Sequence, residues 1–216
     1  MTVPQQERSK LTAERILATA EEVLASAPYA DFSMALVSSS SGLSIGGLYA
    51  RFPNKEALLR EVKNHVLTKL ENDLEAALKT HAGDLPGTVS TFVQTLSTSL
   101  RRRQYLYAFI FTHSAGDAAM RQRGFAFHRR AKQLFTSSLM NDVAAGGTAS
   151  TTKMNMAYEF IVQGLLMRVT SLGSVSATEF LYQGIPSSES YAEALTQATV
   201  LYLNTAPNDQ LIGIGI

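Results

Sequence analysis

The side chains best suited to bind a charged ligand lie within one short stretch of the chain, residues 33–55. Tyr49 offers a hydroxyl on an aromatic body, and Arg51 and Lys55 offer cations, which are groups that contact DNA phosphates. Lys55 falls in the first turn of an expected helix, where the helix dipole disfavours a cation unless an anion is bound there. We therefore predict phosphate contacts, although packing alone would explain Tyr49 and simple exposure would explain both cations.

The same stretch holds apolar and small residues that could face the bases of DNA. Met34 and Ile45 are apolar where exposure is expected, so we expect them to contact thymine methyl groups in the major groove. Gly46 and Gly47 each weaken a helix by about 1 kcal/mol relative to alanine, which is tolerable if the bare backbone approaches DNA. A turn-like start to the helix explains these glycines equally well. The complete set of predicted DNA contacts is Ser33, Met34, Ser44, Ile45, Gly46, Gly47, Tyr49, Arg51 and Lys55.

Helix start and stop signals place these residues on two short helices. A first helix is expected from its N-cap at Thr12 to Pro28, with apolar residues at helical spacing between them. Segments 33–41 and 44–52 follow, separated by Gly42. Two short helices that are joined by a tight glycine-containing turn and braced by a third form the helix-turn-helix plan, whose second helix lies in the DNA major groove.

A run of four serines, Ser38–Ser41, ends the first of these two short helices. Serine is small enough for a tight helix crossing, but it forms helices less readily than alanine and brings no cation to the phosphates. We therefore expect modest affinity for non-specific DNA. The alternative is that the run is a linker.

The stretch from Ser33 to Leu58 resembles the DNA-binding signature of the TetR (tetracycline-repressor-like) family. The matching positions are Gly42-Leu43-Ser44, Gly46, Leu48-Tyr49, Phe52, Lys55-Glu56 and Leu58, and Arg15-Ile16-Leu17 with Ala20 resembles the first helix of the family. The resemblance implies a transcriptional regulator that needs no cofactor. It implies in particular a repressor that leaves double-stranded operator DNA when a small-molecule effector binds.

The rest of the chain has the periodicity of further helices, so the expected fold class is all-α. Asn54 caps a long fourth helix, and later helices are expected at 86–102, 104–113, 117–141, 152–172 and 189–204. Residues 105–111 alternate aromatic and aliphatic side chains, for which a strand is arguable, but aromatic pairs at i,i+4 favour a helix.

The resemblance also implies how the chain is divided and assembled. An N-terminal three-helix helix-turn-helix domain is expected at 1–62, a C-terminal helical ligand-binding and dimerisation domain at 63–206, and a tail at 207–216. A homodimer is implied, in which the last two long helices of each subunit form a four-helix bundle; their small residues allow close approach. An ordinary intramolecular core would explain the same apolar faces.

Aromatic side chains are dense in the second domain and could line an effector pocket. The residues predicted to bind the ligand are Tyr105, Phe109, Phe125, His128, Phe160 and Met167. Plain core packing is the alternative for each of them. Residues 101–141 also carry eight lysines and arginines against one acidic residue, in a chain whose net charge is +1. This segment could attract an anionic effector or supplement DNA contact, although a solvated face is commoner.

Several function classes are disfavoured. The chain has no cysteine, which excludes disulfides, thiolate nucleophiles and cysteine metal sites, and its four histidines have no metal-binding spacing. It lacks the nucleophile elbow, phosphate loop and dinucleotide fingerprint, so we expect no catalytic residues and no enzyme. The alternative is an all-α small-molecule-binding protein or enzyme that uses the aromatic pocket, with His113 or His128 as a base, and binds no DNA. The charged N-terminus and the short apolar runs predict a cytoplasmic protein without a membrane span.

Overall fold

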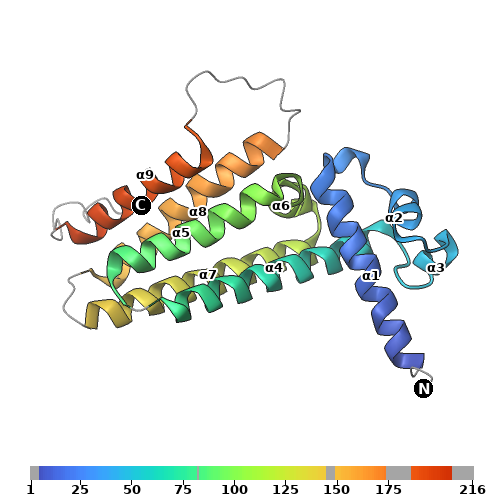
Figure 1. The fold of residues 1–216 in the computed structure, drawn as a ribbon, viewed down its shortest axis with the longest axis horizontal. Coiled ribbons are helices and arrows are strands. Elements are labelled where there is room, and N and C mark those ends of the chain that lie inside the picture. The colour runs from blue at the N-terminus through green and yellow to red at the C-terminus, as the bar shows by residue number, and fades with distance from the viewer. Residues whose placement is uncertain (1–4, 82, 145–148, 174–185, 206–216) are drawn as a thin grey trace.

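The computed structural model describes residues 5–81, 83–144, 149–173 and 186–205 (Figure 1). Every regular element in these ranges is helical, which confirms the all-α fold. The α-helices are α1 (Gln5–Ser26), α2 (Met34–Ser41), α3 (Ile45–Tyr49), α4 (Lys55–Thr80), α5 (Leu85–Arg102), α6 (Gln104–Phe111), α7 (Ala118–Ala144), α8 (Thr151–Gly173) and α9 (Ser188–Asn204). Two short 3-10 helices, η1 (Tyr29–Asp31) and η2 (His113–Gly116), precede α2 and α7. The expected tail at 207–216 lies outside the described residues.

The first helix is longer than its sequence signals predict. It begins at Gln5, so Thr12 lies within α1 and is not its N-cap. The residues before Thr12 include glutamines, a glutamate and a lysine, all of which form helices readily, and nothing there stops a helix. The apolar stripe of Ile16, Ala20 and Leu24 is fully buried, as its spacing predicts.

Capping side chains fix the boundaries of α2, α3 and α4. The Ser33 hydroxyl accepts a hydrogen bond from the Leu36 amide at the start of α2, and Gly42 ends that helix in the left-handed conformation, with φ of 67°. Asn54 Oδ1 accepts from the Ala57 amide at 2.8 Å and starts α4. The three helices α1, α2 and α3 therefore form the predicted helix-turn-helix arrangement at one end of the molecule (Figure 1).

Helix α4 connects this unit to the rest of the protein. It runs without interruption across the expected boundary at residue 62, and its stripe of leucine and valine side chains is buried along its whole length. One end of α4 packs against α1, and the remainder packs against α5 and α7 (Figure 1). A single contiguous core therefore links the helix-turn-helix unit to helices α5–α9.

The later helices match their expected positions closely. Residues 105–111 are helical within α6, which resolves the choice between strand and helix. Helices α8 and α9 pack on each other, and Gly164 makes this contact possible, because a Cβ atom there would lie 2.4 Å from the Tyr191 hydroxyl. Close approach through a small residue thus occurs within the subunit at this position.

Most of the basic segment 101–132 is used inside the molecule. Arg123 pairs with Glu71 at 2.8 Å and Arg130 with Glu75 at 2.6 Å, which ties α7 to α4. Lys132 pairs with Glu159 on α8 at 2.5 Å. These residues are bridges between helices and do not form the solvated basic face that is the commoner arrangement.

Candidate nucleic-acid interface

Helix α3 presents two side chains to solvent and one to the core. Leu48 is fully buried, whereas Ile45 and Tyr49 are 44% and 46% exposed. Residues four apart lie on the same face of a helix, so Ile45 and Tyr49 form one outward patch. Leu36 on α2 is also exposed, which its sequence context did not indicate.

The expectation that Met34 is exposed is wrong. Met34 is the first residue of α2 and is only 6% exposed, together with the buried Val37 and Ser38. These positions are three and four residues apart and therefore share the inward face of α2. Ile45 alone keeps the geometry expected of an apolar base contact.

Ser33 and Ser44 are both exposed and both act as helix caps. The Ser44 hydroxyl accepts from the Gly47 amide at 3.1 Å, as the Ser33 hydroxyl accepts from the Leu36 amide. Each hydroxyl hydrogen is left available to donate to a phosphate oxygen. The caps fix the first turns of α2 and α3, and both capping residues are exposed.

No neighbouring residue within the described structure requires Gly46 to be small. It lies on the exposed side of α3, and a Cβ atom added there would meet nothing within 4 Å. Gly47 differs, because its added Cβ would lie 3.2 Å from Ser44 Oγ and so would crowd the cap. The space at Gly46 favours the interpretation that the backbone approaches another molecule, while Gly47 has an internal explanation.

The two predicted phosphate-binding cations have internal partners. The Arg51 guanidinium donates to the backbone carbonyl and hydroxyl of Ser9, which ties the end of α3 to α1. Lys55 Nζ donates to the Phe32 carbonyl at 2.8 Å and lies 4.5 Å from the centre of the Tyr29 ring. Both side chains are half-buried, so they hold the helix-turn-helix unit together, and each retains further N–H donors.

The serine run belongs to α2 and builds the turn after it. Ser38 Oγ donates to the Leu43 carbonyl at 2.7 Å, and Ser41 Oγ donates to the Ser38 carbonyl at 3.1 Å. A linker would not make such contacts. Ser38 is almost completely buried, so the run stabilises the approach of α2 to α3 from inside.

The six residues predicted to bind an effector do not line one pocket. Phe109 is buried and stacks on Tyr29 of η1 with 5.1 Å between ring centres, whereas Phe160 and Met167 are exposed on α8. Tyr105 is half-buried on α6. The expectation of a joint site for these six residues is therefore corrected. Helical spacing shows which aromatic residues share a face of one helix, but it does not show which helix faces pack against each other.

Phe125 and His128 do line one hollow, an open groove between α7 and α8. The Tyr158 hydroxyl donates to the His128 carbonyl at 3.0 Å and lies 3.1 Å from His128 Nδ1. Because that hydroxyl has one proton, Nδ1 must be the donor in the second contact. Burial lowers the pKa of His128, which favours the neutral ring. His128 is thus held as part of the core.

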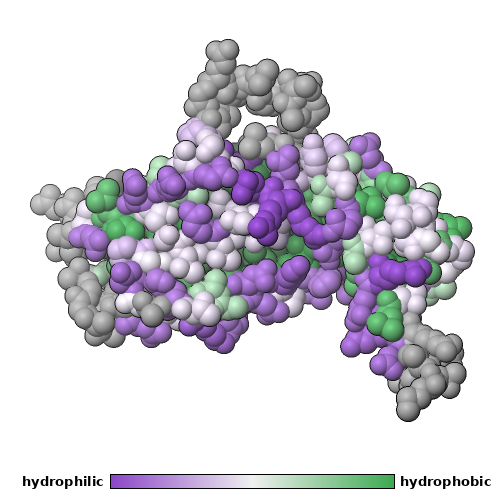
Figure 2. All heavy atoms as spheres, viewed as in Figure 1, coloured by the Kyte–Doolittle hydropathy of each residue, from purple (hydrophilic) through white to green (hydrophobic). Residues whose placement is uncertain are grey.

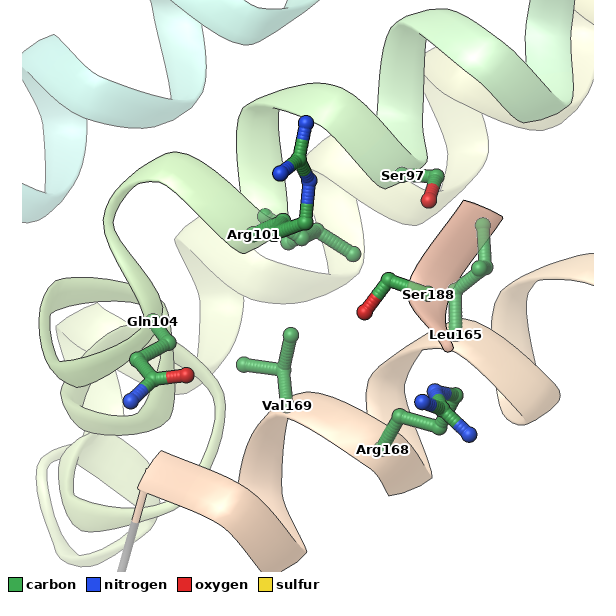
Figure 3. A pocket seen from close by; sticks show the side chains of 8 residues that line it. Ser97, Arg101, Gln104, Leu165, Arg168, Val169 and Ser188 are labelled. Atoms are coloured by element: carbon green, nitrogen blue, oxygen red, sulfur yellow. The ribbon is translucent and has the colours of Figure 1, made fainter. Parts of the chain in front are cut away.

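A small enclosed pocket lies elsewhere, between α5, α6, α8 and the start of α9 (Figure 3). Its enclosed volume is about 40 Å³, and the buried residues Leu100, Leu165 and Val169 form its apolar wall. Arg101 and Arg168 lie at its edge, and their guanidinium groups point away from its centre (Figure 3). Sequence periodicity gave no sign of this pocket, because its walls come from four helices.

The described residues contain no group of three or more histidine, aspartate or glutamate side chains that could hold a metal ion. None of the described helices is long and apolar enough to cross a membrane.

Comparison with known proteins places these features in a wider group. Residues 16–62 match the family model of bacterial regulatory proteins, tetR family. No curated protein shows significant sequence similarity to the chain. The fold is similar to that of a transcriptional regulator from Streptomyces coelicolor A3(2), with 18% identity over 90% of this chain and 99% of the other and a TM-score of 0.65.

Two further solved structures are similar to the same degree. A TetR transcriptional regulator from Rhodococcus sp. RHA1 has 21% identity over 93% of this chain and 100% of its own, with a TM-score of 0.58. The transcriptional regulator FadR from Bacillus subtilis, solved in complex with stearoyl-CoA, has 15% identity over 87% of this chain and 97% of its own, with a TM-score of 0.68. At these identities the likeness concerns the fold, and it extends over nearly the whole chain.

Proposed function

Because the chain belongs to the TetR family of transcriptional regulators, we propose that it is a homodimeric repressor that reads operator DNA with α3 and is released by a small-molecule effector. It acts in the cytoplasm, where its DNA target is. The observation that carries this proposal is the outward face of α3, where Ile45 and Tyr49 stand exposed beside a glycine with open space around it.

The contacts with DNA divide into two kinds. Ile45 and the backbone at Gly46 face the base edges, whereas the hydroxyls of Ser33, Ser44 and Tyr49 face phosphates. Arg51 and Lys55 bind phosphates with the N–H donors that remain after their internal hydrogen bonds are made. The proposed DNA-binding surface therefore carries a modest positive charge, and its specificity comes from shape and apolar contact.

The dimer forms through the exposed stripes of α8 and α9. Met156, Phe160 and Met167 lie four and seven residues apart on α8, and all three are exposed. Leu201 on α9 is exposed as well, and the exposed Ala194 and Ala198 precede it at helical spacing. Exposed apolar side chains on two adjacent helices favour burial against the same surface of a second subunit.

The effector enters the pocket between α5 and α8. An enclosed volume of about 40 Å³ is too small for a whole metabolite, so binding must widen the gap between these helices. The effector therefore binds more tightly to the arrangement with the wider gap than to the one with the narrow gap. This difference in affinity shifts the protein toward the wider arrangement. The apolar wall favours an effector with an apolar part. Arg101 is paired with Glu189 at 3.1 Å, so Arg168 is the edge arginine that favours an anionic group on the effector. FadR from Bacillus subtilis was solved with stearoyl-CoA, so that compound is a suitable first probe.

Binding to selected duplexes tests the proposal. Duplexes are enriched from a random library with the full chain, and affinities are then measured by fluorescence anisotropy at several salt concentrations. Arg51→Gln should weaken binding to all duplexes and reduce the slope of log affinity against log salt by about 1. Arg129→Gln changes the charge equally at an exposed position of α7 and should leave both quantities unchanged. Failure to enrich any duplex would count against the DNA-binding function itself.

A further inference from the structure

A polar cleft lies where the helix-turn-helix unit meets the later helices. It has a volume of about 340 Å³, and its lining comes from α1, α4, the end of α5 and α6. Figure 2 shows strongly hydrophilic residues gathered over this junction. The cleft is separate from the pocket between α5 and α8, because the two share no lining residue.

One wall of the cleft is held by ion pairs that join three helices. Arg103 donates to Glu21 Oε2 at 2.9 Å and also pairs with Glu22, so it joins the start of α6 to α1. His65 Nδ1 on α4 lies 2.8 Å from Glu21 Oε1. Glu21 is almost completely buried, and the Arg103 guanidinium is the cation that offsets its charge. The wall therefore contributes little free charge to the cleft.

The floor of the cleft carries a polar group without a partner. Tyr107 on α6 is only 6% exposed, and its hydroxyl has no hydrogen-bond partner among the described residues. The hydroxyl oxygen is not fully enclosed by the protein and borders the cleft, so it can donate a hydrogen bond to a molecule bound there. Burial raises the pKa of Tyr107 to about 12, so the group keeps its proton at neutral pH and can donate it.

Two cations that line the cleft are not engaged in ion pairs within the described part of the chain. Lys69 projects from α4 and Arg102 from the last turn of α5. Asp73, one turn beyond Lys69 on α4, also lines the cleft and offsets one of these charges. Lys69 and Arg102 together exceed Asp73 by one positive charge, and Arg103 is engaged with Glu21 and Glu22. Cations from two helices that line the same cleft as a hydroxyl donor form a set suited to an anion.

We propose that this cleft binds a small organic anion, whose carboxylate or phosphate oxygens lie between Lys69 and Arg102 and accept a hydrogen bond from the Tyr107 hydroxyl. Asp73 favours an anion that also carries a hydroxyl or amino group, because that group can donate to the carboxylate. A bound anion contacts α4, α5 and α6 beside α1, so it stabilises one placement of the helix-turn-helix unit. This last effect rests on the proposed DNA-binding function, whereas the binding itself does not.

Calorimetric titration of the full chain with citrate and with inorganic phosphate, at constant ionic strength, tests the proposal without DNA. At least one of the two anions should bind the unaltered protein at millimolar concentration or below. Arg102→Gln should weaken that binding by about tenfold or more, as loss of a charge-assisted contact does. Tyr107→Phe should weaken it several-fold while the thermal unfolding temperature without anion stays about the same, since the hydroxyl has no hydrogen bond to another described residue.

Arg129→Gln is the matched control, because it removes one exposed positive charge from α7 outside the cleft. Its affinity for the anion should equal that of the unaltered protein. Absence of binding by both anions at 10 mM, a concentration about tenfold above a millimolar Kd, would overturn the proposal. The proposal would also be overturned if Tyr107→Phe and Arg102→Gln bound the anion as tightly as the unaltered protein. The same holds if the Arg129→Gln control lost as much affinity as these two variants.

Discussion

At the scale of single residues, the α3 surface depends on two glycines, which carry no side chain. Gly46 has room for a side chain within the protein, yet it carries none. Gly47, its neighbour, keeps the Ser44 cap intact by being small. Gly47 thus has a role within the protein, whereas the role proposed for Gly46 is close approach to DNA, and substitution can separate the two.

Gly46→Ala should stabilise the protein or leave its stability unchanged, because alanine favours the helix by up to about 1 kcal/mol. The same change should weaken binding to selected DNA by on the order of tenfold, since the added methyl group would occupy space that DNA needs. Thermal unfolding and anisotropy measure the two effects. Gly124→Ala in α7 is the control, because its added Cβ makes only an ordinary contact at 3.6 Å and lies far from α3 in the sequence. Undiminished DNA affinity in Gly46→Ala would show that the glycine is not needed for close approach.

At the scale of elements, helix ends are where sequence reasoning succeeded. Asn54 caps α4 as expected, and Ser33 and Ser44, the first residues of the two expected short segments, cap α2 and α3, since a cap is a local interaction between neighbouring residues. The burial of the Met34 side chain could not be predicted in this way, because it depends on which elements α2 packs against. The early start of α1 was missed because no local signal marks it.

Contacts between residues far apart in the sequence explain why the six predicted effector residues do not line one pocket. The contact between Phe109 and Tyr29 joins residues that are eighty positions apart, and aromatic spacing within α6 contains no information about it. The ion pairs of Arg123 and Arg130 with α4 have the same character. The sequence indicated the helices and the outward patch of α3. The pockets could not be predicted, because their walls depend on how four helices pack together.

Ser38 ties α2 to the turn that positions α3. Ser38→Ala should lower the free energy of unfolding by about 1 kcal/mol, because the Leu43 carbonyl loses its partner. It should also weaken DNA binding, since the angle between α2 and α3 is then less well fixed. Ser40→Ala, at an exposed position of the same run, should change neither quantity. Chemical denaturation and anisotropy compare the pair, and equal behaviour of the two variants would refute the assigned role.

Lys63 ties α4 to the end of α6. Its ammonium is buried and donates to the Ile110 carbonyl at 2.8 Å, and burial lowers its pKa to about 8. In the unfolded chain the pKa is about 10.4, so the unfolded state binds more protons between these values and stability rises with pH there. Lys63→Met should lack this rise. Denaturation curves of both proteins from pH 7.5 to pH 10 compare the slopes; parallel curves would contradict the burial of a titrating ammonium.

At the scale of the whole molecule, the long helix α4 and the contacts beside it join the helix-turn-helix unit to helices α5 and α7. Arg60 pairs with Asp117 at 2.7 Å, which holds α4 against the start of α7, and this contact lowers the pKa of Asp117. The Tyr29–Phe109 contact holds η1 against α6. A change in the separation of α5 and α8 can therefore reach the helix-turn-helix unit through packed helices.

In the proposed dimer this coupling would control DNA binding, because two copies of α3 must match the spacing of two half-sites. Phe160→Glu should produce a monomer at micromolar concentration and lower DNA affinity by more than about tenfold, since a charge would be buried in the contact. Met140→Glu places the same charge at an exposed apolar position of α7 and should leave the dimer intact. Analytical ultracentrifugation distinguishes the two. A Phe160→Glu protein that remains dimeric would move the interface away from α8.

The base preference of Ile45 variants tests the central claim, that α3 lies in the major groove, most directly. Duplexes selected by the unaltered chain and by Ile45→Asn are sequenced, with Met140→Ala as a control whose selected sequence should not change. If α3 reads bases, Ile45→Asn selects a different base, adenine in preference to thymine, at one position in each of two symmetric half-sites. If the same sequence is selected by all three proteins with equal affinity, α3 does not read DNA.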